Sequence, residues 1–195
     1  MSRARQIALG LAGLACLALP LALLGGGCFG RVGGVDDKAI GTPASADEPQ
    51  RVRIPSLGVD SPLIRVNTLG KDRSVQGPPP EQGMTAGWYS GGAIPGERGV
   101  AVIIGHRDDR DGRTAVFRKL DAVDEGTVID VERGDGRVLH FVVTRTETVE
   151  KSVPVARKEQ PASQERKLLL VTCAGAPDPG ERPARNLVVH ATLRP

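Results

Sequence analysis

Three residues spread along the chain have side chains that together could carry out acyl transfer. Cys173 offers a thiol, His106 an imidazole and Arg185 a guanidinium. A thiolate is a strong nucleophile toward an acyl carbon, and a nearby cation lowers a thiol pKa that is otherwise ~8.5. An imidazole can exchange protons near neutral pH, and an arginine can stabilise the oxyanion of a tetrahedral intermediate. This chemistry requires a fold that brings the three side chains into one cleft.

Each of these residues lies at the end of an expected strand. The apolar run at residues 168–171 leads to Cys173, the run at residues 100–104 leads to His106, and Arg185 precedes a further apolar stretch. An eleven-residue loop between two such strands usually joins antiparallel neighbours, which places the thiol and the guanidinium at one sheet edge. The imidazole joins them if its strand runs parallel to the strand that carries the thiol.

The other segments of the domain also have the patterns of short strands and turns. Alternating apolar and polar residues predict a strand, a tight turn and a second strand over residues 51–64, and a hairpin over residues 127–145. Residues 70–87 are rich in Pro and Gly and predict a long loop, with Trp88 and Tyr89 as its anchors in the core.

The composition favours a β-rich globular domain without a nucleic-acid partner. Only 3% of the 195 residues are aromatic, whereas 25 are Gly and 15 are Pro, which indicates short strands separated by turns. The apolar spacing in residues 114–123 predicts one short helix. Once Arg3 and Arg5 are set aside, 24 basic and 23 acidic residues remain, a balance that lacks the basic excess of nucleic-acid-binding domains.

The N-terminal residues 1–29 predict a membrane anchor or a signal segment. Residues 6–29 carry no charge and are long enough to cross a bilayer, which needs ~20 apolar residues. The positive charges of Arg3 and Arg5 predict that the N-terminus stays in the cytoplasm and the rest of the chain crosses. A cleaved signal peptide and a lipoprotein signal with the lipid on Cys28 are the alternatives.

All three alternatives place the rest of the chain outside the cytoplasm, and the membrane anchor or the lipid would hold it at the cell membrane. Residues 30–50 lack an apolar period and predict a flexible tether, and residues 51–195 form the expected catalytic domain. Cys16 and Cys28 belong to the N-terminal segment, so Cys173 has no obvious partner in a compartment where cysteine pairs oxidise. The leftover thiol is either a reactive nucleophile or a small buried residue.

The motifs around these residues resemble those of sortases, the membrane-anchored cysteine transpeptidases of Gram-positive cell surfaces. The similar stretches are Val171-Thr172-Cys173 after three leucines, Ile104-Gly105-His106 after an apolar run, Arg185 ahead of Leu187-Val188-Val189, and the opening Arg53-Ile54-Pro55-Ser56-Leu57-Gly58-Val59. The similarity covers about residues 51–193. The small size, the Pro- and Gly-rich front loop and the Thr172-Cys173-Ala174-Gly175 context are most like class F sortases.

The resemblance implies an all-β fold, an eight-stranded sortase-type β-barrel with one or two short helices. It also implies that Cys173 is the nucleophile, His106 the acid and base, Arg185 the oxyanion and substrate stabiliser, and Thr172 a substrate-binding residue. In the implied reaction, the thiolate attacks the Thr–Gly bond of an LPXTG-like sorting signal and forms a thioester. The acyl group then passes to a peptidoglycan or pilin amine, with no cofactor or metal expected.

Several alternatives remain open. Arg182 competes with Arg185 for the oxyanion role, and Ala174 stands where class F sortases often have Gly. An L,D-transpeptidase or a papain-like hydrolase also pairs Cys with His, although the chain has no Ser-x-Gly-Cys element. A membrane-tethered binding lipoprotein would leave the thiol packed and inert. A metal site that adds His190 to the thiol and the imidazole lacks the usual ligand spacing.

Overall fold

The structure is a computed structural model that describes residues 40–41, 45–67, 77–108, 111–150, 164–174 and 185–195. The predicted membrane segment and most of the predicted tether lie outside these residues. Among the described residues, none of the helical segments has the length and apolar character needed to cross a bilayer.

Nine strands and three 3-10 turns make up the described part of the chain. The strands are β1 (Ile40–Gly41), β2 (Pro49–Ile54), β3 (Val59–Val66), β4 (Ala86–Tyr89), β5 (Gly99–Ile104), β6 (Val128–Arg133), β7 (Val138–Glu150), β8 (Arg166–Ala174) and β9 (Arg185–Leu193). The turns are η1 (Pro55–Leu57), η2 (Pro80–Gln82) and η3 (Leu120–Ala122).

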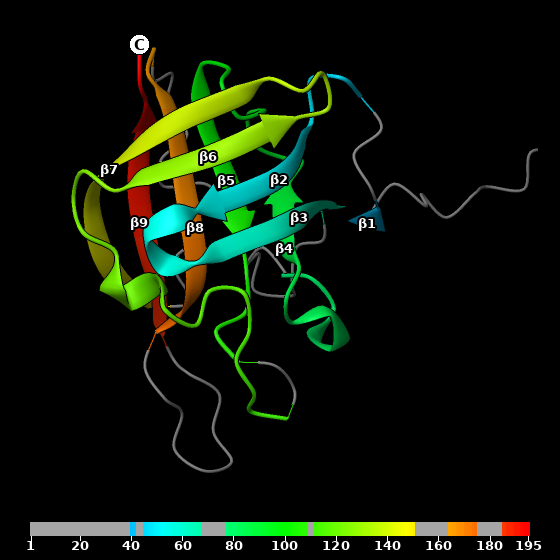
Figure 1. Cartoon of the computed structure of the whole chain (residues 1–195), viewed down its shortest axis with the longest axis vertical. Helices are drawn as coiled ribbons and strands as arrows, with labels where there is room; N and C mark the ends of the chain where they lie inside the picture. Colours follow the sequence, from blue (N-terminus) through cyan, green and yellow to red (C-terminus); the bar gives the residue numbers. More distant parts are fainter. Residues whose placement is uncertain (1–39, 42–44, 68–76, 109–110, 151–163, 175–184) are drawn as a thin grey trace, which may run out of the picture. The chain divides into compact units, whose positions relative to one another are not determined.

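Eight of these strands close into a barrel. They pair in the order β3-β2-β6-β7-β9-β8-β5-β4, and β3 pairs with β4 to complete the ring, while the two-residue β1 adds to the end of β3. Figure 1 shows β6, β2 and β3 crossing in front of β9, β8 and β5. The prediction of an all-β, eight-stranded barrel is confirmed.

Local sequence explains how the strands are connected. The expected strand, turn and strand over residues 51–64 are β2, η1 and β3, and Gly58 ends η1 at φ 69°, a left-handed conformation that favours glycine. The expected hairpin is β6 and β7, joined through Gly136 at φ 80°. β7 extends to Glu150, five residues further than the pattern predicted, and this extra length pairs with β9.

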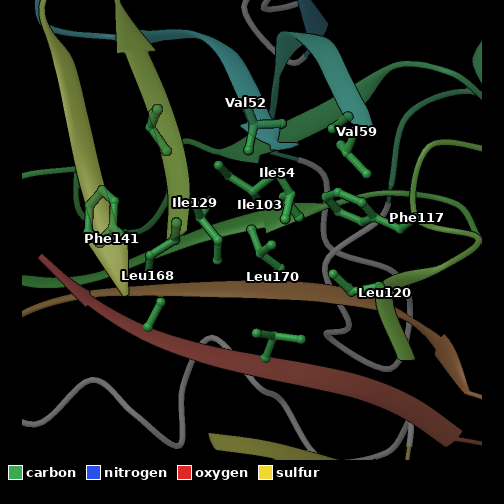
Figure 2. Close-up of a cluster of buried hydrophobic side chains, with 14 of the residues drawn as sticks. Val52, Ile54, Val59, Ile103, Phe117, Leu120, Ile129, Phe141, Leu168 and Leu170 are labelled. Carbon is green, nitrogen blue, oxygen red and sulfur yellow. The ribbon is translucent and has the colours of Figure 1, made fainter. Parts of the chain in front are cut away.

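The barrel interior is filled by apolar side chains from facing strands (Figure 2). Ile54, Phe141, Leu168 and Leu170 are completely buried there. A second cluster lies on the other face of β5, β8 and β9, and it consists of Val100, Val102, Ile104, Leu169, Val171 and Val188. Because both faces of β5 and β8 are buried, their sequences are continuous apolar runs rather than alternating ones.

The short helix predicted at residues 114–123 is present only as η3, and the rest of the segment folds as tight turns that lead into it. Its backbone bonds join residues three apart, from Arg118 to Ala115, from Leu120 to Phe117 and from Val123 to Leu120. A 3-10 turn places residues i and i+3 on one side, so an apolar spacing of three suits it as well as an α-helix. Phe117 and Leu120 are fully buried by this arrangement.

The loop predicted over residues 70–87 ends in a strand that the sequence pattern did not indicate. β4 has only four residues and follows a Pro- and Gly-rich stretch, so it gives a weak periodic signal. It nevertheless closes the barrel between β3 and β5. The predicted core position of Trp88 is confirmed, since the side chain is 3% exposed.

Leu170→Ala should lower the free energy of unfolding by about 2–5 kcal/mol, because it removes a fully buried side chain and leaves a cavity. Urea unfolding of the two proteins measures the difference. Met84→Ala is the control: Met84 is 61% exposed, so the change should stay within about 0.5 kcal/mol. Equal losses in the two variants would contradict the assignment of the core.

Candidate active site

The parallel pairing of β5 with β8 brings the ends of these two strands together. Ile104 pairs with Val171, and the Gly105 N–H donates to the Val171 carbonyl at 3.1 Å. His106 follows Ile104 by two residues and Cys173 follows Val171 by two residues, so both come directly after the last paired residues of the two strands. The parallel orientation that the sequence analysis required is therefore confirmed.

β9 brings the arginine to the other side of the thiol strand. β8 and β9 are antiparallel, as expected, with Cys173 paired to Asn186 and Ala174 paired to Arg185. Side chains alternate between the two faces of a strand, so Asn186 shares the face of Cys173 and lies directly across from it. Arg185 lies at the same end of the sheet, but it pairs with Ala174, so by the same alternation its side chain starts on the opposite face from Cys173.

The guanidinium of Arg185 contacts a carboxylate of the neighbouring strand. Its Nε lies 3.2 Å from Oε1 of Glu150, its partner in the β7–β9 register, and the two side chains are 61% and 60% exposed. Exposed pairs of this kind contribute typically ~0–1 kcal/mol. Little free energy is therefore needed to separate the guanidinium from Glu150. The competing Arg182 lies outside the described residues.

His106 is anchored through both its backbone and its ring. Its carbonyl accepts a hydrogen bond from the Phe117 N–H at 2.9 Å, and its Nε2 lies 2.7 Å from the carbonyl oxygen of Pro78. A Cβ at Gly105 would lie 2.4 Å from Phe117 and 2.7 Å from Val116, so only glycine allows this close packing. The packing of Val116 and Phe117 against Gly105 therefore fixes the backbone position from which the His106 side chain extends.

Cys173 and Thr172 point to opposite faces of β8. Cys173 is a free, partly buried thiol. Thr172 is 4% exposed, pairs with Leu187, and its Oγ1 has no hydrogen-bond partner within the part of the chain that the structure describes. A buried hydroxyl without a partner costs ~1–3 kcal/mol. This hydroxyl belongs to the barrel wall, and its contact with substrate stays a prediction.

The carboxylate of Glu147 on β7 contacts His190 of β9 and Arg145 of its own strand. Its Oε1 lies 2.8 Å from Nε2 of His190, and its Oε2 lies 3.1 Å from Nη1 of Arg145. Burial alone would raise the pKa of Glu147, but the hydrogen bonds and charges of Arg145 and His190 outweigh it and lower that pKa from 4.5. The carboxylate is thus held in its charged form.

The alternative metal site is not assembled in the structure. His190 pairs with Leu169, four residues before Cys173 on β8, a separation of ~13 Å along the strand. His140 is exposed, and its Nδ1 lies 2.7 Å from Oδ1 of Asp130. Across the described ranges, no three His, Cys, Asp or Glu side chains gather as a metal ion would need.

Comparison with known proteins identifies the fold and the family. A model of the sortase domain matches residues 52–194, which is most of the chain. The chain belongs to the sortase family. It is therefore an enzyme of the sortase type, a cysteine transpeptidase. A comparison of this sortase with curated proteins gives no match.

Solved sortase structures share the barrel at low sequence identity. Sortase C2 of Group B Streptococcus Pilus Island 1 is 22% identical with a TM-score of 0.56, covering 74% of this chain and 73% of that one. Sortase A from Corynebacterium diphtheriae is 19% identical with a TM-score of 0.58, covering 78% and 63%. Sortase C-1 from Actinomyces oris is 20% identical with a TM-score of 0.55, covering 74% and 73%. These likenesses show a common fold.

The sequence analysis missed three groups that surround the predicted site residues. Asn186 could have been found by counting the register back from the apolar run of β9. Glu150 could not, because the sequence pattern ended the hairpin five residues earlier. The Pro78 carbonyl has no sequence signature, since every residue has a backbone oxygen and only the folded loop directs this one to His106.

Glu147→Gln should destabilise this sortase at neutral pH and do so less as the pH falls. The folded-state pKa of Glu147 is below 4.5, so its charge stabilises the fold above that value and the contribution is lost as the pH drops through the folded pKa. Urea unfolding between pH 3 and pH 7 measures the difference from the wild type. Glu125→Gln, at an exposed turn, is the control. A difference that widens in acid would contradict the assignment.

Proposed function

We propose that this sortase is a membrane-tethered, extracytoplasmic enzyme that cleaves an LPXTG-like sorting signal and transfers the acyl group to a cell-surface amine. One observation carries the proposal. In the register of β5, β8 and β9, Cys173 and Arg185 lie at the same edge of the sheet, and His106 follows β5 at that edge. A nucleophile, a proton carrier and a cation at one edge are the parts that acyl transfer through a thioester needs.

The first half of the reaction forms the acyl-enzyme. The Cys173 thiolate attacks the carbonyl carbon of the Thr–Gly bond, and the carbonyl oxygen becomes an oxyanion that Arg185 stabilises. The C–N bond then breaks, and His106 donates a proton to the departing glycine amine. The products are a thioester on Cys173 and a released peptide with a new amino terminus.

The second half transfers the acyl group. The acceptor amine attacks the thioester carbonyl, and His106 takes the proton that this amine loses. The C–S bond breaks and the thiolate of Cys173 is restored. Water in place of the amine gives hydrolysis. The imidazole therefore ends the cycle in the protonation state in which it started.

The acceptor is a peptidoglycan or pilin amine. Two structural neighbours support the pilin alternative: one is a pilus-island sortase of Group B Streptococcus, and the other is Sortase C of Streptococcus pneumoniae, which has pilin substrate specificity. The motif around Thr172 supports placement in class F. The charge-free residues 6–29 support a single anchor that leaves the domain outside the cytoplasm, and a lipid on Cys28 or cleavage after translocation would give the same side.

Cys173→Ala should abolish acyl transfer, because no other described thiol is available to form the thioester. His106→Ala should lower the rate about 10²–10⁴-fold through the loss of proton transfer, with the fold intact. Mass spectrometry of the protein incubated with LPXTG-type peptides and a free amine measures both the adduct on Cys173 and the transferred product. Cleavage of the peptide by the Cys173→Ala protein would refute the mechanism.

Arg185→Ala should lower the rate about 10²–10³-fold, as expected for a lost oxyanion donor. Arg182→Ala is the matched control, since it removes the same charge only three residues earlier in the sequence and should leave most of the rate. Steady-state kinetics with one sorting peptide compares them. The reverse ranking would move the oxyanion role to Arg182.

A further inference from the structure

The ring of His106 is engaged by the backbone of the segment that precedes β4. Its Nε2 lies 2.7 Å from the carbonyl oxygen of Pro78. A carbonyl oxygen only accepts hydrogen bonds, so Nε2 carries the hydrogen and, in the neutral ring, Nδ1 carries the lone pair. We propose that Pro78 is a positioning residue whose carbonyl fixes the tautomer and the rotation of the His106 ring.

The backbone of His106 is already fixed without this contact. The Gly105 N–H donates a hydrogen bond to the Val171 carbonyl on β8, and the Phe117 N–H donates one to the His106 carbonyl. These two bonds set the start of the side chain but leave the ring free to rotate about its two side-chain torsions. The bond to Pro78 removes that freedom, which is the role of the third group that orients a catalytic base.

The Pro78 carbonyl is itself rigidly placed. Pro78 is buried and is followed by Pro79 and Pro80, whose rings fix two successive φ angles. Pro79 has φ −52° and ψ 138°, an extended conformation, and its own carbonyl accepts from Gln82 at the end of η2. The Pro78 carbonyl oxygen is therefore held in a more fixed position than it would have in an ordinary flexible loop.

Two glycines allow this segment to lie close to the strands. A Cβ at Gly87 would lie 3.3 Å from Pro78 Cδ and 2.9 Å from Val66, so β4 leaves room for the proline. A Cβ at Gly77 would lie 3.6 Å from Cε1 and 3.7 Å from Nε2 of His106. The segment covers the Cε1–Nε2 edge of the ring. This leaves Nδ1 as the nitrogen that exchanges protons in the reaction.

The inference rests on the proposed role of His106 in the reaction, but its first test does not depend on activity. The full chain in detergent, labelled with ¹⁵N-histidine, contains only three histidines, and His106→Asn identifies the signal of His106. At a pH where the ring is neutral, long-range ¹H–¹⁵N spectra should show hydrogen on Nε2 and none on Nδ1. An Nδ1–H tautomer, or an average of the two, would overturn the proposal even if the enzyme transfers acyl groups.

Pro78→Gly tests the contribution to the reaction, because it frees the backbone that carries the acceptor. The expected result is a kcat about ten- to a hundredfold lower, a KM within about twofold of wild type, and a His106 signal that averages the two tautomers. Pro62→Ala, at an exposed position of β3 outside this segment, is the control and should match the wild type. A Pro78→Gly protein with wild-type kcat and tautomer would overturn the proposal. If the wild type processes no sorting peptide, the proposed function fails while the spectra still decide the ring's orientation.

Discussion

The parallel pairing of β5 with β8 is the contact on which the candidate site depends. In a parallel pair both strands end at the same edge, so the residues that follow Ile104 and Val171 lie next to each other. Most other pairs in this barrel are antiparallel, with β3–β4 the second parallel one. An antiparallel β5 would have placed His106 at the far end of the thiol strand.

β8 lies between two partners, and its rigidity follows from that position. It hydrogen-bonds to β5 on one edge and to β9 on the other, while its two faces pack into the barrel interior and the outer apolar cluster. Strands buried in this way belong to the least mobile part of a domain. The thiol is therefore presented from a fixed backbone, while the residues that meet it come from the ends of neighbouring strands.

Much of this arrangement could be predicted from the sequence because apolar runs are strong signals. The runs before His106 and Cys173 indicated buried strands, and the spacing to Arg185 indicated an antiparallel neighbour, as observed. The four-residue β4 and the 3-10 turns gave no such signal, because short elements lack a period. The offset between Arg185 and Cys173 was also hidden, since it depends on where the register starts. The contact from Pro78 is made by a backbone atom, which no residue type encodes.

The long path of the chain between β5 and β8 affects when the site comes into existence during folding. Ile104 and Val171 are more than sixty residues apart, and β6 and β7 lie between them in the sequence. Contacts between distant residues form late, because the entropy of closing the loop must be offset by other contacts first. A partly folded chain therefore has its thiol and its imidazole far apart. The two groups meet only in the finished barrel, which separates the folding of the protein from the onset of its chemistry.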